Sequence, residues 1–152
     1  MTRPNHFSSA AALAAGYRSG LEVRNMKFLE EAGVTAEYEK HVIRYSKPAS
    51  SHKYTPDFVL PNGVVVETKG RWVTADRQKL KLIRAQHPDI DIRMVFDDPN
   101  RRISKTSKTT YAKVCETLGI PYARKLIPLE WASEPVNEQS RRALAEAEKK
   151  AS

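Results

Sequence analysis

The chain has 152 residues and carries 26 lysine and arginine side chains against 18 aspartate and glutamate, which gives a formal net charge of +8. This length suits one domain, and the apolar stretches are far shorter than the ~18 residues that a membrane-spanning helix needs. One cysteine, Cys115, excludes an internal disulfide, and no Cys/His cluster has zinc-binding spacing. We therefore expect a soluble, cytoplasmic protein without membrane contact, whose excess positive charge favours a polyanion such as nucleic acid as its partner.

The first predicted helix follows a segment without a clear apolar face. Residues 1–15 include an alanine-rich run, and we expect them to be disordered. Ser19 and Glu22 have the Ser-x-x-Glu spacing of a capping box, which predicts a helix that Gly33 ends. In this motif Glu22 can serve simply to cap its own helix, and the spacing alone favours that structural role.

A strand is predicted next, because apolar and polar side chains alternate over residues 34–39. Glu37 and Glu39 share the polar face, where they would ordinarily be solvated. The apolar face carries Val34, Ala36 and Tyr38. A polar connector that contains proline follows at residues 46–51.

The stretch from Tyr54 to Gly70 reads Tyr-Thr-Pro-Asp-Phe-Val-Leu-Pro-Asn-Gly-Val-Val-Val-Glu-Thr-Lys-Gly and predicts a β-hairpin. Pro61 suits the second position of a type I turn, and Gly63 can adopt a positive φ, so we predict a three-residue loop. Asp57 then lies opposite Glu67, with both carboxylates on one face. A two-residue loop would place the two carboxylates on opposite faces.

Lys69 shares that face with Glu67, so two carboxylates and a lysine gather at one end of the hairpin. This set is typical of a nuclease, since a hard cation held by Asp57 and Glu67 can neutralise a phosphate and lower the pKa of a water. A solvated polar edge is the structural alternative. The valines at 64–66 argue against it, because they predict a strand buried on both faces, where charge is costly unless it is paired or bound to metal.

The second half of the chain predicts two helices, a strand, a packed segment and a tail. The helices are expected over residues 74–86 and 110–118, the strand over 90–96, the packed segment over 120–131, and the tail over 136–152. Gly119 ends the second helix, and His87-Pro88 ends the first. We interpret the charged C-terminal tail as a frayed helix, because it contains few large apolar side chains.

A basic segment lies between Pro99 and Lys113 and contains no acidic residue. Most runs of charge are solvated loops. Here the basic side chains alternate with serine and threonine, and together these are the side chains that usually contact phosphates. We expect DNA contacts at Arg71, Arg101, Arg102, Lys105 and Lys108.

Several short runs along the chain, taken together, resemble the phage endonuclease I family of Holliday-junction resolvases. This family lies within the restriction-endonuclease-like nuclease superfamily. The likeness spans about residues 17–135. It rests on Arg18-Ser19-Gly20-Leu21-Glu22, Glu37-Tyr38-Glu39, Pro48-Ala49-Ser50, Tyr54-Thr55-Pro56-Asp57-Phe58, Leu60-Pro61-Asn62-Gly63 and Val66-Glu67-Thr68-Lys69-Gly70, with Lys125-Leu126-Ile127-Pro128 and Glu130-Trp131 near the C-terminus.

The resemblance implies a site with two Mg²⁺ ions, for which Mn²⁺ can substitute. Asp57 and Glu67 would hold one ion together with the backbone carbonyl of Thr68, and Asp57 and Glu22 would hold the second. Lys69 would lie beside the attacking water. Glu22 would thus bind metal as well as cap its helix.

The resemblance also implies a further catalytic acid, Glu37, whose chemical step the sequence does not assign. It implies an α/β fold with a restriction-endonuclease-like mixed central sheet flanked by helices. One endonuclease domain would span residues 16–135, with a hinge at residues 46–51 through which two chains exchange elements in a domain-swapped homodimer. Glu22 of one chain would then complete the site of the other.

We therefore expect a structure-selective endodeoxyribonuclease that resolves four-way and other branched DNA junctions by paired hydrolysis of phosphodiesters. If it is encoded by a phage, it would act in the host cytoplasm. Two alternatives stay open, namely a non-cleaving protein that binds branched DNA, and a sequence-specific restriction-type nuclease on the same core. The set of Asp57, Glu67 and Lys69 favours cleavage over binding alone.

Overall fold

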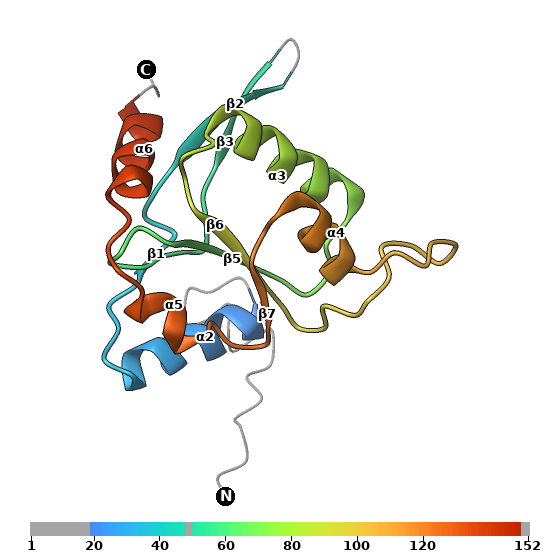
Figure 1. Ribbon diagram of the computed structural model, residues 1–152, viewed down its shortest axis with the longest axis horizontal. Coiled ribbons are helices and arrows are strands. Elements are labelled where there is room, and N and C mark those ends of the chain that lie inside the picture. The colour runs from blue at the N-terminus through green and yellow to red at the C-terminus, as the bar shows by residue number, and fades with distance from the viewer. Residues whose placement is uncertain (1–18, 48–49, 150–152) are drawn as a thin grey trace, which may run out of the picture.

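A mixed sheet runs through the centre of the protein (Figure 1). The computed structural model describes residues 19–47 and 50–149. In spatial order the strands are β1 (Glu37–Tyr38), β4 (Phe58–Val59), β5 (Val65–Lys69), β6 (Ile92–Phe96) and β7 (Tyr122–Arg124). β1, β4 and β5 pair antiparallel, whereas β5, β6 and β7 pair parallel. The predicted α/β class with a mixed central sheet in a single domain is confirmed.

Helices cover both faces of this sheet (Figure 1). α3 (Thr74–Gln86) and α4 (Tyr111–Leu118) pack on one face, and α2 (Gly20–Glu31) and α5 (Leu129–Ser133) pack on the other. Val65 joins the core on the α3 side, and Val64 and Val66 join the core on the α2 side. The prediction of a strand buried on both faces is confirmed.

The predicted signals at the helix ends are confirmed. The Ser19 hydroxyl accepts a hydrogen bond from the Glu22 backbone N–H at 3.3 Å, which caps α2. Gly33 has φ +73° just beyond that helix, and Gly119 has φ +71° just beyond α4. The bounds of α3 are those expected from the sequence.

The loop between β4 and β5 has the predicted three residues. Phe58 pairs with Val66 and Val59 pairs with Val65, and Leu60 N–H donates to the Val64 carbonyl at 2.8 Å. Gly63 has φ +93°, as the closing residue of such a loop requires. Extending this register by one residue sets Asp57 opposite Glu67.

The polar connector predicted at residues 46–51 belongs, in its described part, to a strand pair that the sequence did not predict. Ser46 pairs with Ser51 and Lys47 with Ser50, because a second antiparallel hairpin is formed by β2 (Ile43–Lys47) and β3 (Ser50–Tyr54). Its end is exposed and polar, whereas Ile43 and Tyr54 at its base are buried in the core. Backbone pairing does not require an apolar sequence, so the polar composition concealed a strand pair. Residues 48 and 49, like the predicted disordered residues 1–15, lie outside the described part of the chain.

The helix expected in the charged segment 136–152 is present over residues 138–149, and it is packed where the composition suggests a frayed end. α6 (Glu138–Lys149) packs beside β2, with Leu144 and Ala147 in the core. The Ser140 hydroxyl, which is fully buried, donates to the Gly63 carbonyl at 2.6 Å and so fastens α6 to the loop between β4 and β5. Small side chains make this contact, which explains why the segment contains so few large apolar residues.

The strand predicted over residues 34–39 is shorter than expected, since only Glu37 and Tyr38 pair. Its apolar side is as predicted, because Val34, Ala36 and Tyr38 pack against the core on the α2 side of the sheet. In the described part of the chain no helix combines the length and apolarity needed to cross a membrane.

Candidate active site

Asp57 lies where β4 begins, at the edge of β5. Its Oδ2 atom accepts hydrogen bonds from the Thr68 backbone N–H and from the Thr68 hydroxyl, both at 2.8 Å. The carboxylate is therefore turned along β5 toward Thr68. The predicted register, with Asp57 opposite Glu67, agrees with the pairing of β4 and β5, and the prediction that both carboxylates lie on one face stays a prediction.

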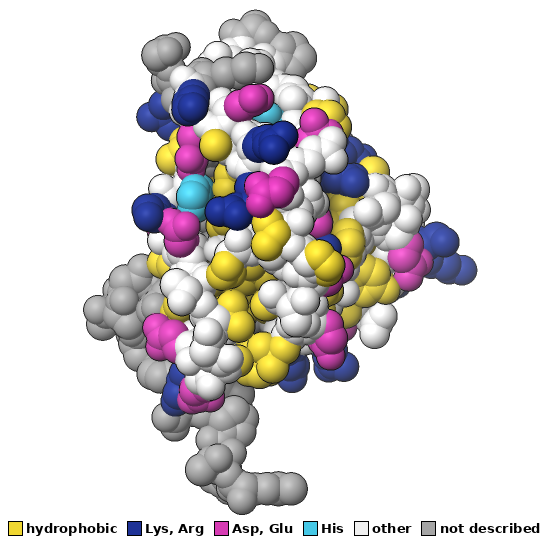
Figure 2. Space-filling model, turned by 60° about the vertical axis from the view of Figure 1, so that its left-hand side comes forward, with side chains coloured by type: hydrophobic (Ala, Val, Ile, Leu, Met, Phe, Trp, Pro, Cys, Tyr) yellow, Lys and Arg dark blue, Asp and Glu magenta, His cyan; other side chains and the backbone are white. Residues whose placement is uncertain are grey.

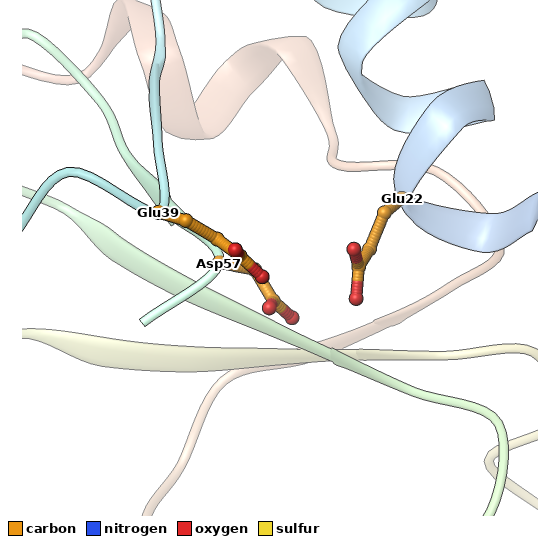
Figure 3. A group of neighbouring side chains, drawn as sticks. All are labelled: Glu22, Glu39 and Asp57. Atoms are coloured by element: carbon orange, nitrogen blue, oxygen red, sulfur yellow. The ribbon is translucent and has the colours of Figure 1, made fainter. Parts of the chain in front are cut away.

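The Asp57 carboxylate lies close to two other carboxylates, one of which comes from α2 (Figure 3). Glu22, Glu39 and Asp57 each offer an oxygen atom, and these oxygens lie within 4.8 Å of one another. Glu22 comes from the first turn of α2, and Glu39 follows β1 with a positive φ of 47°. Tyr38 donates a hydrogen bond to Glu22 Oε2, and its hydroxyl lies 3.2 Å from Glu39 Oε1. A set of oxygen donors at this spacing is suited to a hard divalent cation.

Glu67 lies on the other side of Asp57 with a different set of neighbours. The Tyr54 hydroxyl donates to Glu67 Oε2 at 2.6 Å. The Lys69 ammonium lies 4.0 Å from Glu67 Oε1 and 3.5 Å from Asp76 Oδ2. Lys69 is thus held between two carboxylates, with 30% of its side chain exposed.

One cavity of about 410 Å³ joins the two groups. Its lining includes five residues predicted from the sequence, namely Glu22, Asp57, Glu67, Thr68 and Lys69. It also includes Tyr54 and Lys79. The structure therefore brings the predicted metal ligands and the predicted catalytic lysine into one concave site.

Burial dominates the electrostatics of this cavity. Burial, with a smaller contribution from the nearby Asp57 carboxylate, raises the pKa of Glu67 to about 8, against the Tyr54 hydroxyl and Lys69, which lower it. Burial likewise raises the pKa of Asp57 to about 6, with a smaller contribution from Glu22, while the hydrogen bonds from Thr68 oppose the change. Both raised pKa values indicate that the protein compensates the negative charge of these carboxylates poorly. A bound cation would stabilise that charge.

Glu37 is placed differently from the other predicted site residues. Its Oε2 atom lies 2.8 Å from the Lys40 ammonium and 3.1 Å from His41 Nε2, and it is absent from the carboxylate group of Figure 3. The hydrogen bond from Lys40 lowers the pKa of Glu37 most. His41 Nδ1 in turn lies 2.6 Å from Glu148 of α6, so Glu37 has a structural part in linking the turn after β1 to α6. Its catalytic role stays a prediction.

The five predicted DNA-binding residues are all exposed. Arg71 lies two residues beyond β5, and Arg101 donates to the Gly70 carbonyl at 3.3 Å, which ties the start of the basic segment to the end of β5. The segment then projects away from α4 (Figure 1), and Lys105 and Lys108 lie on it. The face that carries α5 and α6 mixes acidic and basic side chains (Figure 2), so it offers no comparable stretch of one charge.

The residues near the carboxylates that sequence reasoning missed include Glu39, Tyr38, Tyr54 and Lys79. Glu39 was assigned to a solvated face by strand alternation, which its positive φ interrupts. The hydroxyls of Tyr38 and Tyr54 reach carboxylates that are remote in sequence, and Lys79 lies over the Tyr54 ring at 5.1 Å. The one available signal was the position of Tyr38 and Tyr54 inside the quoted runs, next to acidic residues.

Comparison with known proteins gives consistent matches. The family model for phage endonuclease I matches residues 3–151. The chain is 52% identical over 122 residues to a protein named endonuclease I from Escherichia phage T7, a match that covers 80% of this chain and 82% of that protein. It is 46% identical over 132 residues to endodeoxyribonuclease 1 of Enterobacteria phage T3, which covers 87% of each.

Replacing Glu67 with Gln is expected to stabilise the metal-free protein increasingly as pH rises. Since the pKa of Glu67 is about 8 in the folded chain and its ordinary value is 4.5, the folded state holds a proton between these pH values that the unfolded chain has released. Stability therefore falls as pH rises through this window, by up to about 1.4 kcal/mol for each pKa unit. Glutamine cannot titrate and removes this loss.

Urea unfolding in EDTA at about pH 5 and about pH 8 measures the effect. The gain of Glu67→Gln over the unsubstituted chain should be small at the lower pH and larger at the higher one. Asp76→Asn is the control, since it removes a half-buried carboxylate that also faces Lys69. An equal gain at both pH values would contradict the predicted charge burden on Glu67.

Proposed function

The chain belongs to the phage endonuclease I family and is a deoxyribonuclease, and from this premise we propose that it resolves four-way DNA junctions with divalent metal ions. One observation carries the proposal. The Glu22, Glu39 and Asp57 oxygens lie within 4.8 Å of one another, and Glu22 and Asp57 line a cavity together with Glu67 and Lys69. Such a group of oxygen donors can hold a metal ion that acts on a phosphodiester.

The residues present fit a hard divalent cation such as Mg²⁺ or Mn²⁺. All the acidic donors are carboxylates, with neither thiolate nor imidazole among the residues that line the cavity. We assign one ion to Asp57 and Glu67 with the Thr68 carbonyl, and a second to Asp57 and Glu22. When bound, such ions supply neutralisation of phosphate charge and a lower pKa for a coordinated water.

The protein's own groups have separate tasks in this proposal. Thr68 holds the Asp57 carboxylate through two hydrogen bonds, which fixes the residue shared by both ions. Lys69 is held at the wall of the cavity by Glu67 and Asp76, from where its ammonium would orient the attacking water against the scissile phosphate. Lys79 lines the same cavity and adds positive charge to receive the DNA backbone.

We further propose that the working form is a domain-swapped homodimer with a restriction-endonuclease-like fold. The mixed sheet with helices on both faces supports the fold assignment. The β2–β3 hairpin separates a first unit, α2 and β1, from the catalytic strands. Contacts between the two units, such as those of Glu22 with Asp57 and of buried Asn25 with Ile127, can form within one chain or be exchanged between two. Two composite sites would suit a substrate cut on two opposed strands.

Two other functions share this structure. A non-cleaving protein that binds branched DNA would have no use for a cavity in which carboxylates are buried at an electrostatic cost. A sequence-specific restriction-type nuclease would share the catalytic groups and differ in how it selects DNA. The resemblance to junction resolvases favours selection by shape, and action in the cytoplasm of a phage host follows from the same resemblance.

Cleavage is expected to require Mg²⁺ or Mn²⁺ and to fall by at least about 100-fold in Asp57→Asn, Glu67→Gln and Lys69→Ala. Junction binding should survive, because basic contacts to phosphates supply most of the affinity. Labelled four-way junction and linear duplex, mixed in equal amounts with purified protein, report cleavage and selectivity together. Undiminished cutting in EDTA would refute the metal proposal, and equal cutting of both substrates would refute junction selectivity.

Mixing inactive chains tests whether the sites are composite. A Glu22→Ala chain and an Asp57→Ala chain are each expected to be inactive alone. In an exchanged dimer, one site receives both substitutions and the other receives neither, so coexpression should restore about one working site per heterodimer. Continued inactivity of the coexpressed pair, with dimers present, would show that each chain completes its own site.

Replacing Arg101, Arg102 and Lys105 together with Ala is expected to weaken binding to all DNA. Each lost phosphate contact should reduce the slope of log affinity against log salt by up to ~0.9. Arg142→Ala with Lys149→Ala serves as the charge control, since both residues are exposed on α6. If the triple substitution leaves the salt slope unchanged, the basic segment is a solvated loop.

A further inference from the structure

Two tyrosine hydroxyls contact the carboxylates that flank Asp57, one on each side. Tyr54 donates to Glu67 at 2.6 Å, and Tyr38 donates to Glu22. We propose that Tyr54 and Tyr38 are positioning residues, which hold Glu67 and Glu22 in the orientations that bind the two metal ions. This inference rests on the proposed metal-dependent function and adds to it a pair of groups that act through the ligands.

Tyr54 is well placed to fix a side chain. It ends β3, opposite Ile43 of β2, and is 5% exposed within the core. The Lys79 ammonium lies 5.1 Å from the centre of its ring. The Tyr54 hydroxyl is the donor in its hydrogen bond to Glu67.

The two oxygens of Glu67 consequently have different surroundings. Oε2 accepts the hydrogen bond from Tyr54, whereas Oε1 lies 4.0 Å from the Lys69 ammonium. A buried carboxylate that lost the Tyr54 hydrogen bond could turn about its last side-chain bond, and a metal ion would then have to restore the lost orientation. Hydrogen bonds to ligating groups typically account for 10- to 100-fold in metal affinity or activity.

Tyr38 provides the same support on the opposite side of Asp57. Its ring packs against Phe58 with centroids 5.6 Å apart, and its hydroxyl lies within hydrogen-bond distance of both Glu22 and Glu39. The hydroxyl has one proton and can donate to one of these carboxylates at a time. Glu39 therefore shares a tyrosine with a proposed ligand, which ties the orientation of Glu22 to the turn after β1.

Neither pair depends on whether chains exchange elements. Tyr38 and Glu22 both precede the hinge at residues 46–51, and Tyr54 and Glu67 both follow it. Each tyrosine therefore stays in the same chain as the carboxylate to which it donates, whether or not two chains exchange elements. A closed chain and an exchanged dimer contain the same two hydrogen bonds, so the inference holds for either.

Tyr54→Phe and Tyr38→Phe test the proposal, with Tyr45→Phe as the matched control. Tyr45 belongs to the same buried cluster as Tyr54 and also lies beneath Lys79, at 5.9 Å, but it donates to no carboxylate among the described residues. Each change removes one hydroxyl and keeps the ring. The readouts are Mn²⁺ affinity by calorimetry without DNA, and the cleavage rate of a four-way junction as a function of Mn²⁺ concentration.

We expect the dissociation constant for Mn²⁺ to rise about 10- to 100-fold in Tyr54→Phe and in Tyr38→Phe, and less than about 3-fold in Tyr45→Phe. Excess Mn²⁺ should restore much of the lost cleavage, which it would not do for a misfolded chain. Adding Tyr54→Phe to Glu67→Gln should then change Mn²⁺ affinity little, because the hydroxyl acts through Glu67.

Wild-type affinity for Mn²⁺ in both variants would overturn the proposal, as would an equal loss in Tyr45→Phe. If urea unfolding shows that Tyr54→Phe does not fold, Tyr38→Phe decides the matter, since Tyr38 is half-buried and tolerates the loss more readily. Failure of the proposed function has a different signature, in which the unsubstituted protein itself binds no Mn²⁺ or cuts fully in EDTA.

Discussion

The central constraint on this protein is the burial of several carboxylates in one cavity. Asp57 and Glu67 lie next to each other on paired strands, and Glu22 and Glu39 approach from another helix and turn. Charge that is removed from water and surrounded by like charge is costly. The structure compensates with specific donors, since Thr68 bonds Asp57, Tyr54 bonds Glu67 and Tyr38 bonds Glu22. These donors leave part of the negative charge uncompensated, which suits the cavity to a cation. A bound cation would in turn suit it to a phosphate.

The sheet gives this cavity its rigidity. β5 is a central strand with partners on both sides and cores on both faces, so Glu67, Thr68 and Lys69 leave it in set directions. The loop that sets the register of Asp57 is covered by α6 through the bond from Ser140 to Gly63. A helix that looked like a tail from its composition therefore stabilises the turn on which the register of the site depends.

The residues of the catalytic hairpin were predictable because their information is local. Pro61 and Gly63 determine a three-residue loop, alternation then determines the register, and the register sets Asp57 opposite Glu67. The bounds of α3 and the caps of α2 and α4 were equally local. Composition was a weaker guide at the β2–β3 hairpin and at α6, because polar strands and helices with small side chains gain their order from contacts that are distant in the chain.

Motif spacing and turn chemistry depend on near neighbours in the chain. The strands and loop of the hairpin at residues 54–70, the acidic and basic groups on it, and the family could therefore be read from the sequence. Only the tertiary structure decided which of these groups meet. In the folded chain the Asp57 carboxylate accepts a hydrogen bond from Thr68, and Glu39 lies with Glu22 and Asp57. Glu37 instead contacts Lys40 and His41. The physical reason is that the direction of a side chain at the end of a strand is set by the hydrogen bonds and packing around it, and these come from segments that periodicity cannot place.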